Sequence, residues 1–164
     1  MNRALHSFNK ESCSHFAMPL VIGLLAATTS GAASADNVDV EVKVIQSDVS
    51  PPSGYNPPWG CSETQPGPGN ALHVICVNPE TVVTKPNRMG DPVQITWNLT
   101  SSGWAFPAGG GGIFIKKKNK WVISVDSTTK YSATNKKETG KKYSYTVNVL
   151  NGTYLLTWDP TIMN

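Results

Sequence analysis

His73 is the only histidine outside the first 35 residues, which restricts the chemistry that the chain can carry. A Ser-His-Asp site would depend on this one imidazole, and the sequence contains no G-x-S-x-G motif to present the serine. A blue-copper site needs two histidines, a cysteine and usually a methionine, whereas the available ligands are His73, Cys76, Met89 and Met163. We therefore expect no cofactor and no metal. A small periplasmic hydrolase or metal-binding protein that uses His73 remains the alternative.

Four aromatic side chains lie in segments rich in proline and glycine: Tyr55, Trp59, Trp104 and Phe106. Rings held in stiff loops offer a large contact area at a small cost in conformational entropy, which suits the recognition of sugars or proteins. The alternative is that these rings fold onto the open ends of the domain, because large apolar residues usually find burial. We predict that the four residues bind a ligand, which we expect to be a cell-envelope polysaccharide or protein.

Lysines gather in two predicted turns. Four belong to the segment KKKNK at residues 116–120, and four more belong to NKKETGKK at residues 135–142. If the two turns lie at the same end of the domain, they would attract an anionic partner such as an acidic polysaccharide, lipopolysaccharide or acidic protein. The alternative is that the lysines keep the turns solvated and stop strand edges from pairing with other chains. The first turn supplies the candidate ligand-binding residues Lys116, Lys117, Lys118 and Lys120.

Residues 1–35 have the features of a secretory signal peptide in the expected order. Basic residues precede an apolar run at residues 16–27, and Ala33-Ser34-Ala35 supplies the small residues that signal peptidase requires. The run is twelve residues long, shorter than the roughly 20 residues that cross a bilayer, so a membrane anchor is the weaker alternative. We predict cleavage before Asp36, no membrane span afterwards, and a bacterial protein that is periplasmic or secreted.

The mature chain, residues 36–164, is long enough for one domain with one core. It has twelve Lys+Arg against ten Asp+Glu, a formal net charge of +2, and we expect no nucleic-acid partner. Its two cysteines, Cys61 and Cys76, form an even pair in a chain bound for an oxidising compartment, so we predict a disulfide. The bond would tie down the Pro/Gly-rich loop at residues 50–70, which contains six prolines and four glycines.

Short apolar runs rich in β-branched and aromatic residues alternate with Gly, Pro, Ser and Lys along this chain, as in strands joined by solvated turns. The clearest run is residues 37–49, where every second residue from Val38 to Val44 is valine. Turns recur without a helix between the strands, which predicts an all-β fold, an antiparallel immunoglobulin-like β-sandwich of about 8 strands. The predicted strands are residues 37–49, 71–77, 81–84, 93–99, 113–115, 121–125, 130–134, 143–149 and 153–158.

The alternation along these strands also predicts where individual side chains point. Trp97 lies between Ile95 and Leu99 on the apolar face of its strand and is expected at the centre of the core. His73 alternates with apolar neighbours, so we expect its imidazole at the surface or at a sheet edge. Asn151-Gly152 is the sequence typical of a type I′ turn between the last two strands.

The segments WNL, GWAFPAGGGGIFI and YSYTVNVLNGT and the closing DPTIMN resemble a group of small exported proteobacterial proteins that end in a DP-x-I-x-N tail. The resemblance covers residues 93–164, and its motifs are structural. It implies an immunoglobulin-like or cupredoxin-like sandwich and brings neither an activity nor a site residue with it.

The sequence thus favours an exported, non-enzymatic binding or interaction module, because it lacks recognisable catalytic groups. Besides the alternative based on His73, a third hypothesis is a structural subunit that completes the sheet of another chain through an exposed edge strand.

Overall fold

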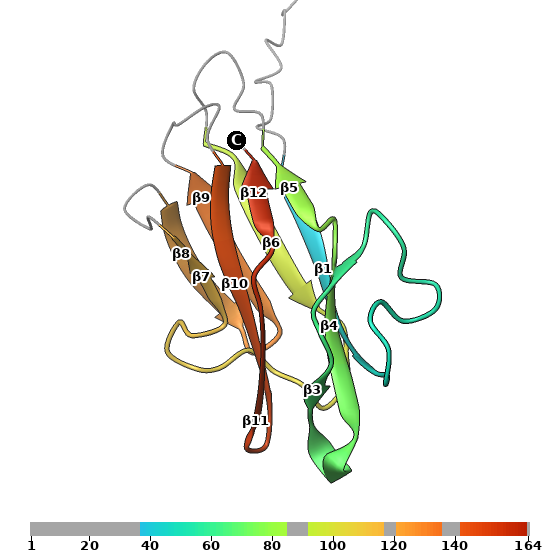
Figure 1. Ribbon diagram of the computed structural model, residues 1–164. Helices are drawn as coiled ribbons and strands as arrows, with labels where there is room; N and C mark the ends of the chain where they lie inside the picture. Colours follow the sequence, from blue (N-terminus) through green and yellow to red (C-terminus); the bar gives the residue numbers. More distant parts are fainter. Residues whose placement is uncertain (1–36, 85–91, 117–120, 136–141, 164) are drawn as a thin grey trace, which may run out of the picture. The chain divides into compact units, whose positions relative to one another are not determined.

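The computed structural model describes residues 37–84, 92–116, 121–135 and 142–163 (Figure 1), all within one compact unit, Ala32–Asn164. The predicted signal peptide at residues 1–35, together with Met89, Lys117, Lys118 and Lys120, lies outside these residues.

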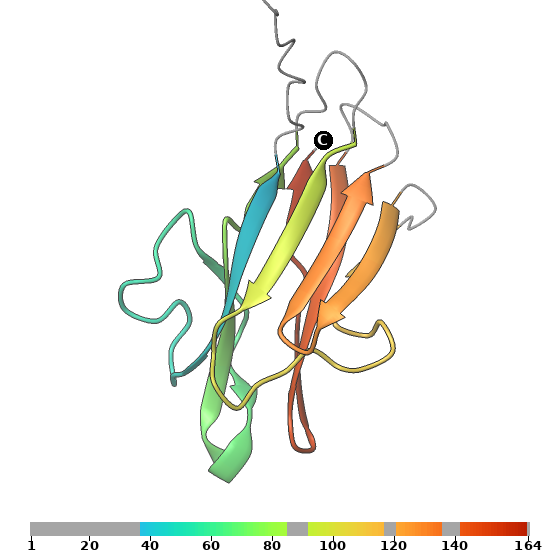
Figure 2. The same cartoon turned by 180° about the vertical axis from the view of Figure 1, so that it is seen from behind.

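The described chain folds into an all-β sandwich of two sheets packed face to face, which confirms the predicted fold class (Figures 1 and 2). One sheet has the order β2-β4-β1-β6-β9-β8, with β3 also paired to β4. Its strands are β1 (Val38–Gln46), β2 (Gly60–Cys61), β3 (Gln65–Pro66), β4 (Leu72–Asn78), β6 (Gln94–Leu99), β8 (Trp121–Ser127) and β9 (Lys130–Asn135). The other sheet contains β5 (Thr81–Val83), β7 (Ile113–Ile115), β10 (Lys142–Asn151), β11 (Tyr154–Trp158) and β12 (Thr161–Met163).

The strand pairings depart from a wholly antiparallel sandwich at two places. β1 runs parallel to β6, and β12 runs parallel to β5, whereas the other paired strands are antiparallel. Both parallel pairs join strands that are far apart in the sequence, so turn signals between neighbouring strands could not reveal them. The sandwich is therefore built from mixed sheets.

The core lies between the sheets and is filled by the strand residues that alternation selects. Val40 and Val42 of β1 are buried in it, and Trp97 of β6 is fully buried, as predicted. The Trp97 ring packs against Tyr145 of β10 with 5.5 Å between ring centroids. Burial of the Tyr145 hydroxyl raises its pKa above the ordinary value.

The end of the chain adds a strand that the sequence pattern does not reveal. β12 follows β11 after Asp159 and Pro160, and both strands pair with β10 in one continuous register. Asp159 and Pro160 interrupt the apolar pattern, and proline cannot donate a hydrogen bond to a neighbouring strand. The Pro160 carbonyl nevertheless accepts one from the Tyr145 amide at 3.1 Å, so the pairing with β10 continues. The prediction that residues 153–158 complete the sheet was therefore wrong, because it omitted β12.

The turn between β10 and β11 lies one residue later than predicted. Asn151 pairs with Tyr154, so the two-residue loop consists of Gly152 and Thr153. Gly152 has φ = 58° at the first loop position. A positive φ at this position alone is the geometry of a type II′ turn, which twists as hairpin strands require.

A glutamine side chain joins the two sheets at the edge near β3. The Gln65 amide donates a hydrogen bond to the Thr157 carbonyl at 3.0 Å and accepts one from the Thr157 amide at 2.9 Å. The Gln65 side chain thus supplies hydrogen-bond partners for the amide and carbonyl of Thr157 on the edge strand β11. This link fixes the chain just before β4, on the side of the sandwich that carries the Pro/Gly-rich loop.

Candidate functional site

Two partly exposed aromatic rings stand together on the Pro/Gly-rich loop. The rings of Tyr55 and Trp59 meet edge to face, with their centroids 5.0 Å apart. Backbone turns position them, because the Tyr55 amide donates to the Pro52 carbonyl at 3.1 Å and the Trp59 amide to the Asn56 carbonyl at 3.0 Å. Each ring is therefore held by its own turn and by the neighbouring ring. Rings that are already ordered lose little conformational entropy when a ligand binds.

A charged pair from β1 lies beside these rings. The ammonium nitrogen of Lys43 is 5.3 Å from the centre of the Trp59 ring and 3.0 Å from Oε1 of Glu41. Its hydrogen bond to Glu41 raises the pKa of Lys43 above the ordinary value. The Thr100 hydroxyl donates to the same carboxylate oxygen at 3.2 Å. We call Glu41, Lys43, Tyr55 and Trp59 the Trp59 cluster.

The cysteine pair ties this loop to the sheet. The sulfurs of Cys61 and Cys76 are 2.02 Å apart, at bonding distance, which agrees with the predicted disulfide. Ser62 adds two hydrogen bonds to Ile75: its amide donates to the carbonyl at 2.8 Å, and its hydroxyl accepts from the amide at 3.0 Å. Cys61 follows Trp59 by two residues, so these bonds restrain the aromatic end of the loop.

The other two predicted ligand-binding rings belong to the core. Trp104 and Phe106 are 8% and 3% exposed, and each packs against another ring, His73 and Tyr131 respectively. The backbone of Ala105, between them, pairs with Leu150 of β10 and draws the segment onto the sandwich. These two rings are not available to stack on a ligand. Their burial agrees with the alternative, in which they fold onto an open end of the domain.

His73 is buried rather than at the surface, which corrects the prediction. Its ring packs edge to face on Trp104, with 5.4 Å between centroids, and its Nδ1 lies 3.0 Å from the Ala71 carbonyl. Gly67 lies against the imidazole so closely that a Cβ there would collide with the ring. His73 thus helps to close one end of the sandwich. No cluster of three or more His, Cys, Asp or Glu side chains suited to a metal occurs in the described ranges.

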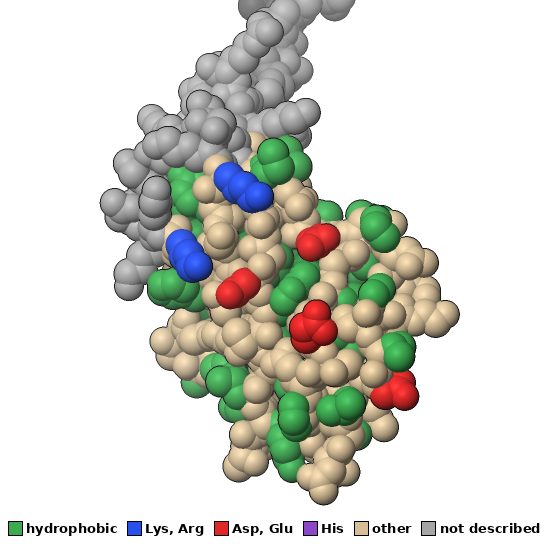
Figure 3. Space-filling model, in the orientation of Figure 1, with side chains coloured by type: hydrophobic (Ala, Val, Ile, Leu, Met, Phe, Trp, Pro, Cys, Tyr) green, Lys and Arg blue, Asp and Glu red, His purple; other side chains and the backbone are tan. Residues whose placement is uncertain are grey.

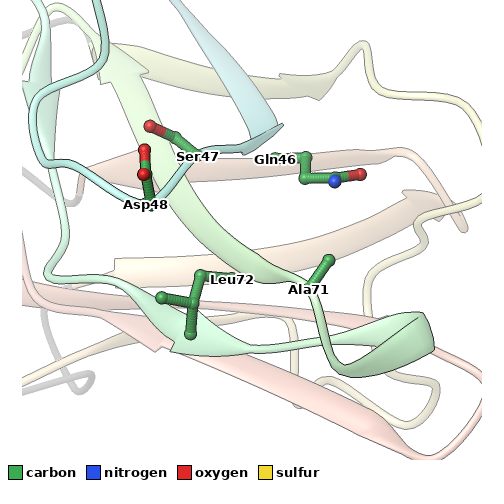
Figure 4. Close-up of a pocket in the computed structure, with 5 residues that line it drawn as sticks. All are labelled: Gln46, Ser47, Asp48, Ala71 and Leu72. Carbon is green, nitrogen blue, oxygen red and sulfur yellow. The ribbon is translucent and has the colours of Figure 1, made fainter.

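A shallow pocket opens near the start of β4 (Figure 4). It has a volume of about 280 Å³ and a single carboxylate, that of Asp48. Its side chains point in different directions in Figure 4 and form no acid–base pair. The lining residues are Gln46, Ser47, Asp48, Ala71 and Leu72. The pocket offers less for recognition than the Trp59 cluster does.

The strands that flank the two lysine-rich turns end next to one another. The Lys116 amide, just after β7, donates to the Ser144 carbonyl of β10 at 3.0 Å. Trp121 at the start of β8 pairs with Asn135 at the end of β9. Of the lysines in these two turns, the structure describes Lys116 and Lys142, and both side chains are exposed. On the face shown in Figure 3, the basic side chains lie in the upper part.

β8 is the outermost strand of its sheet and, among the described strands, pairs with β9. Val122 and Val125 are about half exposed on it. A register shift between Val125 and Ser127 interrupts the ladder. Such irregularities discourage pairing with another chain, so the regular edge is short.

Comparison of the sequence with models of known protein families and with characterised proteins found no match. Within the described residues, no helix is long and apolar enough to cross a membrane. An all-β fold with a cysteine pair at bonding distance is compatible with an exported protein.

Proposed function

We propose that the protein is an exported, non-enzymatic module that binds a cell-envelope polysaccharide through the Trp59 cluster. The observation that carries the proposal is the pair of partly exposed rings beside a lysine–glutamate pair, on a loop held by the disulfide. The C–H face of a sugar stacks on an aromatic ring, while its hydroxyls exchange hydrogen bonds with neighbouring charged groups. The cluster offers both kinds of contact within one small area.

The position of His73 favours this proposal over the hydrolase alternative. A general base must come within hydrogen-bond reach of the substrate, whereas His73 is buried, packs edge to face against Trp104 and approaches the Ala71 carbonyl. The interrupted edge of β8 likewise gives less support to a subunit that pairs through that strand.

The substitution Trp59→Ala tests the proposal. We expect it to weaken binding to isolated envelope polysaccharide at least tenfold, because a central aromatic anchor is lost. Pull-down of the polysaccharide with purified protein measures the effect. Tyr154→Ala is the matched control, since Tyr154 is a partly exposed ring on the opposite sheet. Equal binding by wild type and Trp59→Ala would refute the role of the cluster, and retention of a protein by the wild type instead would change the class of ligand.

A second candidate is attraction of an anionic envelope polymer to the end of the sandwich that carries Lys116 and Lys142. The arrangement of the flanking strands supports it, since both lysine-rich turns connect strands that meet at this end. We expect Lys116→Glu/Lys142→Glu to weaken binding to an acidic polysaccharide and to reduce its dependence on salt, because long-range attraction between charges is screened. Affinity measured at two salt concentrations checks this, and unchanged affinity at low salt would contradict it.

A further inference from the structure

A row of polar side chains leads from the Trp59 cluster across the outer face of the sheet. Glu41 of β1 is the register partner of Asn98 of β6, Asn98 that of Lys130 of β9, and Lys130 that of Ser127 of β8. The residues on either side of Glu41 and Asn98 enter the core, as does Tyr131 next to Lys130, so these three side chains share the outer face. Ser127 is exposed directly opposite Lys130, beyond the register shift in β8. We call Glu41, Asn98, Lys130 and Ser127 the polar row. Figure 2 shows this sheet face-on, with the Pro/Gly-rich loop beside β1.

The next row along the same strands is also polar. Asp39 of β1 lies opposite Thr96 of β6, and Thr96 lies opposite Ser132 of β9. The Ser132 hydroxyl donates to the Asp126 carboxylate of β8 at 3.1 Å. The two rows thus place hydroxyl, amide and carboxylate groups side by side on the outer face between β1 and β8, with the Ser132 side chain itself buried.

The charges on this face nearly cancel. Lys43 and Lys130 are basic, whereas Asp39, Glu41 and Asp126 are acidic. A polyanion gains little from such a surface, and neither does a polycation. Balanced donors and acceptors suit a neutral ligand that has many hydroxyl or amide groups, and such ligands include neutral oligosaccharides.

We propose that the polar row extends the Trp59 cluster into a binding face for a linear, neutral polysaccharide of β-1,4-linked pyranose units, the linkage that gives the extended chain that such a row can accommodate. The inference rests on the proposed function and adds the class and the length of the ligand. Neighbouring strands lie about 4.8 Å apart, so the row from β1 to β8 spans roughly 14 Å. One strand spacing is close to the length of one pyranose unit. A chain anchored on Trp59 would thus contact the row with about three further units.

Titration calorimetry with β-1,4-linked oligosaccharides of glucose and of N-acetylglucosamine, two to six units long, tests the proposal. For the wild type we expect affinity for at least one series to rise at least tenfold between two and five units and then to level off. Asn98→Ala/Lys130→Ala should bind the disaccharide as the wild type does and lose the gain with length. Trp59→Ala should lose binding at every length. Thermal unfolding of each variant establishes that the fold is retained.

The possible results separate the two proposals. Affinity that does not change with length, or an Asn98→Ala/Lys130→Ala variant that keeps the full gain, overturns the extended face, while the loss in Trp59→Ala still supports the cluster. Tighter binding of β-1,4-linked mannuronate oligosaccharides overturns the neutral class. Failure of the wild type to bind either series, while it still retains isolated envelope polysaccharide through Trp59, overturns the extended face alone. Failure to retain that polysaccharide as well overturns both proposals.

Discussion

Trp97→Ala is expected to lower the free energy of unfolding by about 3–5 kcal/mol, the range for large aromatic side chains truncated in a core. Trp97 is fully buried at the centre of the core and packs on Tyr145 of the opposite sheet. Its removal would leave a cavity between the sheets that rigid strands cannot close. Chemical denaturation followed by far-ultraviolet circular dichroism measures the loss.

Trp97→Phe is the matched control for that prediction. The indole nitrogen of Trp97 has no hydrogen-bond partner of good geometry among the described residues. Phenylalanine would keep much of the ring volume and remove an unsatisfied donor, so we expect a much smaller loss than with alanine. If the two substitutions cost the same, the indole nitrogen must have a partner such as a buried water, and packing alone would not explain the effect.

Strands with one buried face and one solvent-exposed face were predictable from the sequence. In β1 the valines alternate with Asp39, Glu41 and Lys43, and Val40 and Val42 are the residues that enter the core. In β10, Tyr143 to Val149 alternate in the same way. Because the side-chain period of a strand is two, the pattern fixes which face is buried.

The same reasoning fails for β4, since both of its faces are covered. Ile75 and Val77 enter the core, but Val74 and Cys76 on the other face are fully buried as well, although they lie outside the central cluster. The disulfide and the preceding loop pack on that side. With apolar residues on both faces, alternation cannot tell which way His73 points, and the ring faces inward.

For the candidate site, loop composition selected four rings, of which Tyr55 and Trp59 are partly exposed whereas Trp104 and Phe106 are buried. All four rings lie in Pro/Gly segments, yet the pairing of Ala105 with Leu150 pulls Trp104 and Phe106 into the core. Lys43 and Glu41 were missed, because contact between β1 and the loop depends on the fold. The sequence did show that both residues lie on the solvent-exposed face of the most regular predicted strand.

The disulfide is the covalent link between the loop of the Trp59 cluster and β4, and its removal has the second large effect. In Cys61→Ala/Cys76→Ala, we expect the free energy of unfolding to fall by about 3 kcal/mol, the value for a closed loop of about 15 residues. The unfolded chain regains the freedom that the bond removed. Denaturation of the double variant, and of the wild type under reducing conditions, should give the same loss.

Binding should fall further than global stability accounts for. The aromatic end of the loop would still be linked to β4 and the turn after it by the two-residue strand β2, by the Ser62 hydrogen bonds, and by the hydrogen bond from the Glu80 amide to the Pro58 carbonyl at 2.9 Å. Such a short contact opens locally at a low free energy, so Tyr55 and Trp59 would spend less time beside Lys43. We expect weaker polysaccharide binding under conditions in which the double variant is fully folded. Unchanged binding there would mean that the Ser62 hydrogen bonds and the loop turns hold the rings without the disulfide, whose role would then be stability alone.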